Sequence, residues 1–303
     1  MSEPLPLAAP PARPVRVVFL GTPDDAVPSL RSLVDAGVDV ALVVSGPDRR
    51  RGRRSSPTPT PVKAAALELG LPVTTEVADA LDVGADLGIV VAFGQLIRRP
   101  VLEQLPMLNV HFSLLPRWRG AAPVERAILA GDTETGVCIM GLEVGLDTGP
   151  VYSRAVTPIS DTDTAAELRE RLAVLGAELL VDTFRAGLGE PAPQEGEATH
   201  AAKFDTLDRK IDWNATAVDV HRLVRIGGAW TMFDGKRVKV HEIAVHDGPP
   251  ANGSGPGDFD DAVVTTGEGS VVLRTVQPEG KPRMDAAAWQ LGLRADAPRT
   301  FGE

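Results

Sequence analysis

Near the start of the chain, residues 15–24 read VRVVFLGTPD. The first six are apolar apart from Arg16, which predicts a buried strand over residues 15–20. Thr22 followed by Pro23 provides a helix N-cap and a proline for the first turn, so a helix is predicted over residues 23–36. A strand that is apolar on both faces and leads directly into a helix is typical of a parallel sheet covered by helices on both sides.

The same alternation continues toward the middle of the chain. Strands are predicted over residues 38–44, 86–93, 108–115 and 135–142, and helices over residues 61–69, 123–130 and 164–187. Residues 15–187 are therefore predicted to form an α/β, Rossmann-like domain with a mainly parallel sheet. Neither a G-x-G-x-x-G after the first strand nor a P-loop is present, so the pattern indicates neither a dinucleotide nor a nucleoside triphosphate as ligand.

The pattern of apolar and polar residues changes in the last third of the chain. Residues 188–205 are rich in Gly, Pro and Glu and are predicted to be a linker. Short alternating runs separated by turn residues follow, which predict a small OB-like β-barrel over residues 206–303. Residues 1–14, rich in Pro and Ala, are predicted to be a disordered tail.

Composition narrows the class of protein. Hydrophobic residues make up 43% and charged residues 24%, ordinary values for a globular protein, and no apolar run reaches the length of about 18 residues that a membrane helix needs. A single cysteine, Cys138, excludes an internal disulfide and cysteine-based metal clusters. Cys138 lies in an apolar run and is predicted to be a buried hydrophobic residue. With no signal peptide evident, we expect a soluble cytoplasmic protein without a membrane partner.

The charge distribution qualifies the net charge of −10, which alone argues against a nucleic-acid partner. One loop concentrates positive charge in an otherwise acidic chain. Its arginines are Arg49, Arg50, Arg51, Arg53 and Arg54. Such a run is either a solvated turn or a phosphate-binding loop, and its composition does not decide between them.

Three polar residues are candidates for catalysis. Asn109 and His111 lie two apart in a predicted strand, so their side chains share one face of the sheet. The loop SLLPRWRGAAP follows at residues 113–123, and Asp147 lies further on between glycines. From spacing alone, a structural histidine and an ordinary turn remain open alternatives.

Together these segments resemble the folate-dependent formyltransferases. That family carries N-x-H-x-S-L-L-P, then R-G-x-x-P, and D-x-G about thirty residues later, and the resemblance implies that Asn109, His111 and Asp147 are catalytic. Asn109 and protonated His111 would stabilise a tetrahedral oxyanion, while Asp147 would orient the imidazole and favour its protonated form. The resemblance also implies a folate site made of Ser113, Leu114, Leu115, Pro116, Arg119, Gly120, Ile89, Val91 and Gly94.

Within the family, the methionyl-tRNA formyltransferase branch matches best. The matching segments are GTPD at residues 21–24, TGVCIM at residues 135–140, IDW at residues 211–213 and QPEGK at residues 277–281. This resemblance implies transfer of the formyl group of 10-formyltetrahydrofolate to the α-amine of methionyl initiator tRNA, for translation initiation. It also implies tRNA contacts by the arginine loop and the barrel, no metal and a monomer. The alternatives are formylation of an amino-sugar nucleotide and tRNA binding without turnover.

Three positions depart from the branch. Asp25 stands where a phenylalanine is usual, and Phe112 stands where a small residue is usual, which predicts a narrower folate site. Residues 226–228, Ile-Gly-Gly, replace a proline-containing segment.

Overall fold

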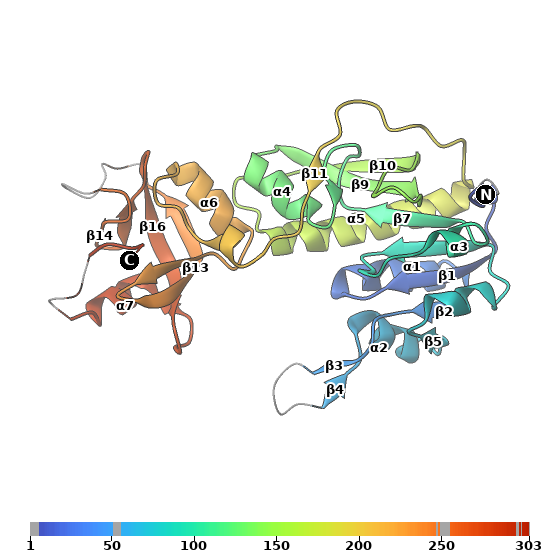
Figure 1. Cartoon of the computed structure of the whole chain (residues 1–303), viewed down its shortest axis with the longest axis horizontal. Helices are drawn as coiled ribbons and strands as arrows, with labels where there is room; N and C mark the ends of the chain where they lie inside the picture. The colour runs from blue at the N-terminus through green and yellow to red at the C-terminus, as the bar shows by residue number, and fades with distance from the viewer. Residues whose placement is uncertain are drawn as a thin grey trace, which may run out of the picture. The chain divides into compact units, whose positions relative to one another are not determined.

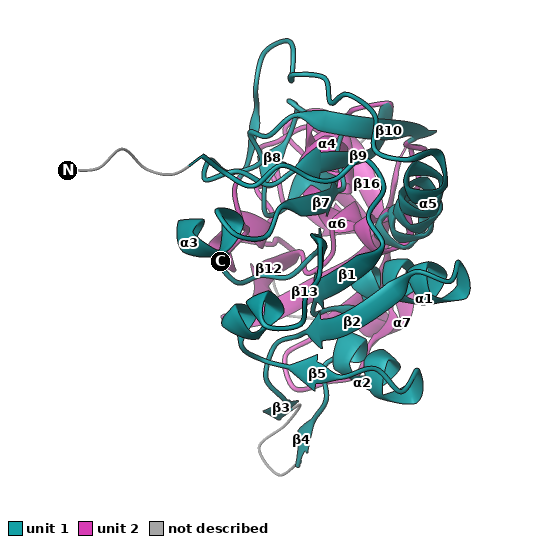
Figure 2. Ribbon diagram, turned by 90° about the vertical axis from the view of Figure 1, so that its right-hand side faces the viewer, with its two compact units in different colours: residues 1–124, 134–158, 169–201 teal, residues 125–133, 159–168, 202–303 magenta. Residues whose placement is uncertain are grey.

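The computed structural model describes residues 6–50, 56–246, 248, 255–294, 297 and 299–302. The chain forms two compact units, coloured separately in Figure 2. Unit 1 comprises residues 1–124, 134–158 and 169–201, and unit 2 comprises residues 125–133, 159–168 and 202–303. The formyltransferase-like half of the sequence therefore contributes two short segments to unit 2.

Unit 1 is built on a seven-stranded sheet with the strand order β10-β9-β7-β6-β1-β2-β5 (Figure 1). Neighbouring strands from β7 to β5 are parallel, which confirms the predicted mainly parallel sheet, whereas β9 and β10 are antiparallel to their neighbours. The strands are β1 (Arg16–Gly21), β2 (Asp39–Val44), β5 (Val73–Thr74), β6 (Leu87–Val91), β7 (Met107–His111), β9 (Glu134–Gly141) and β10 (Val151–Pro158).

Helices flank this sheet, with α1, α2 and α5 along one side and α3 on the other (Figure 2). The predicted helix over residues 23–36 is divided, because Pro28 in the first turn of α1 cannot donate a helical hydrogen bond. Thr60 caps α2 by accepting a hydrogen bond from the Lys63 N–H at 3.2 Å. The helices are η1 (Asp24–Ala26), α1 (Val27–Asp35), α2 (Pro61–Glu68), η2 (Val77–Leu81), α3 (Arg99–Leu102), α4 (Pro123–Ala130) and α5 (Ala165–Ala186).

The chain leaves the sheet earlier than predicted after β7. That strand ends at His111 rather than at residue 115, because the chain turns and the Ser113 hydroxyl donates to the Arg117 carbonyl at 2.6 Å. Further on, β8 (Arg119–Gly120) pairs in parallel with β11 (His200–Ala201). The predicted linker thus returns to the loop that follows β7.

Unit 2 contains a curled antiparallel sheet, a half-barrel, which confirms the predicted small β-barrel fold of this part of the chain. Its strand order is β12-β13-β16-β15-β14, with β17 paired to β16. The strands are β12 (Trp230–Phe233), β13 (Lys236–Val245), β14 (Phe259–Asp260), β15 (Val263–Thr265), β16 (Ser270–Pro278) and β17 (Met284–Asp285). The helices of its C-terminal part are η3 (Leu207–Arg209), α6 (Ala217–Arg225) and α7 (Ala286–Leu291).

Five aromatic rings form the centre of the unit 2 core. Phe301 stacks on Trp213 and Phe259, with ring centroids 5.4 Å and 4.7 Å away. Phe233 and Trp289 meet edge to face at 5.1 Å. All five side chains are less than a tenth exposed, so this cluster is the main apolar support for the half-barrel.

Two predicted terminal or loop segments are partly described. In the tail, the Ala8 N–H donates to the Leu102 carbonyl and the Ala12 carbonyl accepts from Leu188, so these residues are held against the fold. Two short antiparallel strands, β3 (Arg49–Arg50) and β4 (Pro57–Thr58), flank the arginine loop. Arg51, Arg53 and Arg54 lie outside the described residues. Over the described part of the chain, the helices are too short or too polar to cross a membrane.

Candidate functional site

Two of the three candidate catalytic residues lie on β7, between β6 and β9. Asn109 and His111 project from the same face, and the intervening Val110 projects toward α5, where it approaches Gly176. Asn109 is half-buried, while His111 is only 6% exposed. The strand therefore presents the Asn109 amide and the His111 imidazole on the same face of the sheet, where both are largely shielded from solvent.

The third residue, Asp147, reaches this face from the loop after β9. Its Oδ2 accepts a hydrogen bond from the Gly120 N–H at 2.8 Å and lies 3.7 Å from His111 Nδ1. Its Oδ1 is 3.5 Å from the Asn109 Nδ2. Asp147 has a positive φ of 51°, a conformation that Asp tolerates better than most residues. The structure thus brings together the three residues that the sequence singled out.

The imidazole of His111 is oriented by a partner that the sequence did not indicate. Nε2 lies 3.0 Å from the backbone carbonyl oxygen of Trp118. A carbonyl can only accept, so Nε2 carries the proton and donates it. Nδ1 is then the nitrogen that faces Asp147, and it is available to bind a proton. Trp118 has a positive φ of 62°, which points its carbonyl at the ring.

The residues expected at a folate site differ in exposure and fall into three groups. The side chains of Ile89, Val91, Ser113 and Leu115 are at most 2% exposed, so they support the strand and loop from within. Gly94 has a positive φ and no neighbour near the place of a side chain, so the chain is open there. The remaining candidates, Leu114, Pro116, Arg119 and Gly120, are half-buried.

A polar side chain that the sequence analysis missed, that of Gln194, joins the loops around the site. Gln194, in the linker, accepts hydrogen bonds from Arg119 Nε and Nη2 at 2.9 and 2.6 Å. Its amide nitrogen donates to the Asp147 and Gly149 carbonyls at 2.9 and 2.7 Å. Sequence distances of 45 to 75 residues separate these partners, so no local pattern could reveal the contact.

Cys138 lies beside the site, paired with His111 across the β7–β9 ladder, and packs with Leu115, Met140 and Val151. Burial raises the pKa of its thiol; a backbone hydrogen bond from Leu115 and the charge of Arg154 oppose this shift. The predicted buried, apolar role is confirmed.

We expect the Cys138 thiol to resist a chromogenic disulfide reagent in the folded protein at pH 7, because the reactive thiolate is both rare and buried. Unfolding in guanidinium should release one equivalent of reactive thiol per chain, since the sequence has one cysteine. Rapid labelling of the native protein would contradict this description.

Two of the departures from the family pattern have structural consequences. Asp25 lies 3.4 Å from Arg169 and forms an ion pair, so its carboxylate is compensated. Phe112 is buried and its ring approaches Gly176 of α5. The ring therefore points away from the face that carries Asn109 and His111, and the expected narrowing of the site does not follow.

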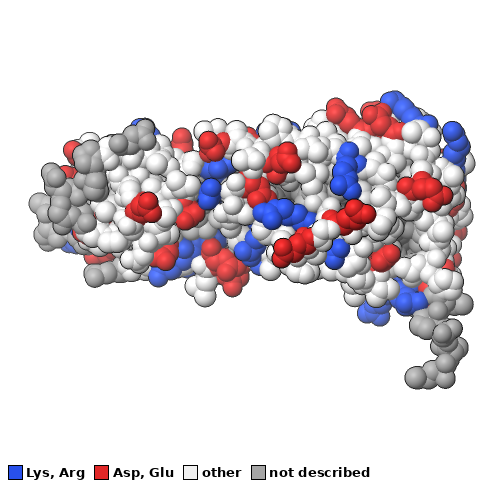
Figure 3. Space-filling model, turned by 90° about the horizontal axis from the view of Figure 1, so that it is seen from above, with Lys and Arg blue, Asp and Glu red and all other residues white. Residues whose placement is uncertain are grey.

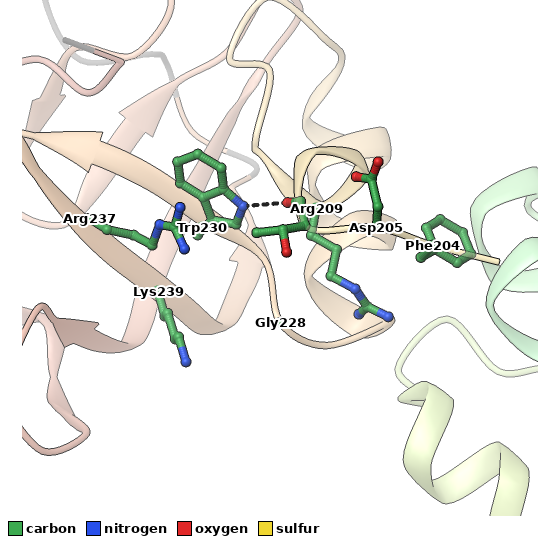
Figure 4. A pocket seen from close by; sticks show the side chains of 8 residues that line it. Phe204, Asp205, Arg209, Gly228, Trp230, Arg237 and Lys239 are labelled. Carbon is green, nitrogen blue, oxygen red and sulfur yellow. Dashed lines mark hydrogen bonds between the residues drawn. The ribbon is translucent and has the colours of Figure 1, made fainter.

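Unit 2 carries a separate basic hollow of about 470 Å³ (Figure 4). Arg209, Arg237 and Lys239 line it, with Asp205 as the acidic residue. The Arg237 guanidinium lies 4.1 Å from the centre of the Trp230 ring, whose N–H donates to the Thr206 carbonyl. The surface of the hollow is therefore positively charged and backed by an aromatic ring. Over the described part of the chain, no three His, Cys, Asp or Glu side chains cluster as metal ligands.

Family models match both parts of the chain. The model for "Formyl transferase" matches residues 15–184, and that for "Formyl transferase, C-terminal domain" matches residues 203–294. The chain belongs to the formyl transferase family.

Curated relatives of this formyl transferase are similar over nearly their whole length. A protein of a Jannaschia species named methionyl-tRNA formyltransferase is 45% identical, with 95% of this chain and 100% of the relative covered. A Paracoccus denitrificans protein of the same name is 46% identical, with 92% and 98% covered.

Solved structures share the fold of this formyl transferase at low identity. An N-formyltransferase from Helicobacter canadensis, solved with folinic acid and dTDP-3-aminofucose, has a TM-score of 0.65 at 16% identity, covering 87% of this chain and 99% of that one. The methionyl-tRNA formyltransferase from Clostridium thermocellum has a TM-score of 0.59 at 14% identity, covering 78% and 95%.

Proposed function

We propose that this formyl transferase moves the formyl group of 10-formyltetrahydrofolate to the α-amine of methionyl initiator tRNA, preparing it for translation initiation. The observation that carries the proposal is the convergence of Asn109, His111 and Asp147 on one face of β7 in a chain whose relatives of 45–46% identity are named methionyl-tRNA formyltransferase. We further propose that the protein acts in the cytoplasm as a monomer and without a metal ion.

Asn109 and His111 supply the groups that formyl transfer needs. Attack of an amine on the formyl carbon forms a carbon–nitrogen bond and places negative charge on the formyl oxygen. The Asn109 amide donates one hydrogen bond to that oxygen. With Nε2 committed to the Trp118 carbonyl, the second donor is the Nδ1–H of protonated His111. Both donors are fixed before the substrate arrives, which is the condition for strong stabilisation of the developing charge.

Asp147 holds the site together and faces the proton that must move. Its carboxylate, tied to the Gly120 N–H at 2.8 Å, lies 3.7 Å from His111 Nδ1 and balances the positive charge of the imidazolium. The attacking amine loses a proton, and the leaving nitrogen of the folate gains one as its bond to the formyl carbon breaks. The Asp147 carboxylate approaches both catalytic side chains, Asn109 at 3.5 Å and His111 at 3.7 Å, and is the proposed relay for this proton.

The loops around the three catalytic residues have a surface suited to the flat aromatic rings of the folate formyl donor. Leu142, at the start of the loop that carries Asp147, packs against the cluster containing Phe93 and Ile97, so the loops after β6 and β9 are neighbours. These loops expose Leu96, Val144 and Leu146, each more than 60% accessible. A pterin or aminobenzoyl ring lying over such side chains would remove apolar area from water. We propose that Gly94, the 113–116 loop, Arg119 and Gly120 form the rest of the folate site, with Ile89 and Val91 beneath it.

The tRNA would be held by positive charge at two places. One is the arginine loop, of which Arg49 and Arg50 are exposed on β3. The other is the basic hollow of unit 2. Acidic and basic side chains are interspersed on the face drawn in Figure 3. The two proposed tRNA-binding surfaces are therefore local features of a chain whose net charge is −10.

We expect the joint replacement of Arg209, Arg237 and Lys239 by alanine to weaken tRNA binding and to flatten its dependence on salt. Each lost phosphate contact lowers the slope of log K against log salt by about 0.7–0.9, because fewer counterions are released. Filter binding at several salt concentrations measures both quantities. Arg31→Ala, which removes an exposed arginine paired with Glu68 in unit 1, is the matched control.

The arginine loop is tested in the same way with Arg49, Arg51 and Arg53 replaced by alanine. Unchanged affinity and salt slope in both multiple variants would show that neither surface binds tRNA.

The proposed function is tested by assaying the purified protein with 10-formyltetrahydrofolate and three acceptors in parallel. The acceptors are initiator methionyl-tRNA, elongator methionyl-tRNA and an amino-sugar nucleotide. We expect rapid formylation of the initiator tRNA. Formylation of the sugar alone would overturn the acceptor, and binding of tRNA without formylation would overturn the enzymatic role.

A further inference from the structure

We infer that Gln194 is a positioning residue for formyl transfer, which fixes Asp147 in its working place from the linker that leads to the C-terminal domain. The inference rests on the proposed function, since it gives Gln194 a role only if Asp147 has one. The hydrogen bonds of Gln194 go to Arg119, Asp147 and Gly149 and not to Asn109 or His111, so its effect passes through Asp147.

The Gln194 amide uses its full hydrogen-bonding capacity. An amide nitrogen has two protons and an amide oxygen has two lone pairs. Both protons go to the loop that carries Asp147, at the Asp147 and Gly149 carbonyls, 2.9 and 2.7 Å away. Both lone pairs accept from Arg119, at 2.9 and 2.6 Å. The side chain is a clamp between the loop after β9 and the segment after β7.

Both sets of Gln194 hydrogen bonds affect the position of the Asp147 carboxylate. On one side, Gln194 holds the Asp147 carbonyl and thereby the left-handed backbone conformation, φ 51°, that directs the side chain. On the other side, Arg119 precedes Gly120, whose N–H donates to Asp147 Oδ2 at 2.8 Å. A residue in an uncommon backbone conformation persists only where its surroundings fix it, and here Gln194 supplies two of those contacts.

The linker is itself anchored on both sides of Gln194. Ala192 exchanges two backbone hydrogen bonds with Val151, at 2.8 and 2.9 Å. The Thr199 hydroxyl accepts from the Trp118 N–H at 2.8 Å, next to the carbonyl that orients His111. Gln194 therefore lies on a segment fixed to the first residue of β10 and to the segment after β7. The predicted linker is part of the site's framework and does more than connect two domains.

The size of the effect follows from the geometry of catalysis. A displacement of a catalytic group by about 1 Å can lower a rate by about a hundredfold. Loss of the clamp frees the Asp147 loop without removing any catalytic group, so we expect kcat of Gln194→Ala to fall about 10- to 100-fold. The KM for 10-formyltetrahydrofolate should change much less than kcat, because Gln194 is expected to act on the placement of Asp147.

The test is a double-mutant cycle of wild type, Gln194→Ala, Asp147→Ala and the double variant, assayed with initiator methionyl-tRNA. If Gln194 acts through Asp147, its replacement costs almost nothing once Asp147 is gone, and the double variant matches Asp147→Ala within about twofold. The inference would be overturned if the loss of kcat in the double variant equalled the product of the two single losses. It would also be overturned if Gln194→Ala kept the wild-type kcat. Full activity of Asp147→Ala itself would instead overturn the proposed catalytic site, so the two failures are distinct.

Two further variants identify which half of the clamp matters. Gln194→Glu keeps the oxygen acceptors for Arg119 and loses both donors to the Asp147 loop, so it should lose activity as Gln194→Ala does. Near-normal turnover of Gln194→Glu would show that only Arg119 is held, against the inference. Glu195→Ala, which changes the exposed neighbouring residue, should behave as wild type. Thermal unfolding of each variant separates a loss of folding from a loss of positioning.

Discussion

His111→Ala is expected to lower kcat for formylation of initiator methionyl-tRNA by about 10²–10³, the usual effect of removing one preorganised donor from an oxyanion site. The ring is 6% exposed and its Nε2 lies 3.0 Å from the Trp118 carbonyl, so the fold fixes the position of this donor. KM for the folate donor should change little, because the lost interaction is made mainly in the transition state. Asn109→Ala should give a loss of similar size for the same reason.

Single-turnover formylation rates, with protein in excess over methionyl-tRNA, measure this effect without a contribution from product release. His200→Ala is the matched control, since it removes an exposed histidine of the same unit whose strand pairs through its backbone. Thermal unfolding shows whether the variant keeps its fold. A folded His111→Ala protein with near-normal turnover would remove this residue from the proposed mechanism.

Part of this site follows directly from sequence. The two-residue spacing of Asn109 and His111 in an apolar run places both side chains on one face, because successive residues of a strand alternate. The same rule places Phe112 with Val110 on the opposite face, and applied there it would have removed the expectation of a narrower site. The spacing of apolar residues likewise predicted the central strands of the sheet. Together with the capping residues it predicted α2 and α4 with bounds close to those observed.

The rest depends on tertiary structure. Asp147 reaches His111 because β9 runs antiparallel to β7 and the loop after it folds back over the sheet, and the apolar run over residues 135–142 has no feature that reveals strand direction. Trp118 acts through its carbonyl, so its residue type carries no signal for that role. Gln194 acts over 45 to 75 residues from a segment that reads as a linker. Hydrogen bonds to backbone atoms of distant loops leave little trace in residue patterns.

Phe301→Ala is expected to have the largest effect on stability, lowering the free energy of unfolding of unit 2 by about 3–5 kcal/mol. The ring is 3% exposed and stacks on Trp213, Phe259 and Trp289 with centroids within 5.9 Å. Its removal leaves a cavity among rigid rings that cannot collapse to fill it. Trp213, Trp230 and Trp289 all lie in unit 2, so tryptophan fluorescence during urea unfolding reports chiefly on this unit.

Leu291→Ala is the control, because Leu291 is 89% exposed on α7 and its replacement should change stability by no more than about 0.5 kcal/mol. Equal midpoints for the two variants would contradict the central role of the ring cluster. The consequence for function follows from strand positions. Trp230 begins β12 and Lys239 lies on β13. Phe233 of β12 and Val238 and Val240 of β13 belong to the same core cluster as Phe301. If the basic hollow binds tRNA, Phe301→Ala should therefore lose tRNA affinity over the same range of urea in which its tryptophan signal changes.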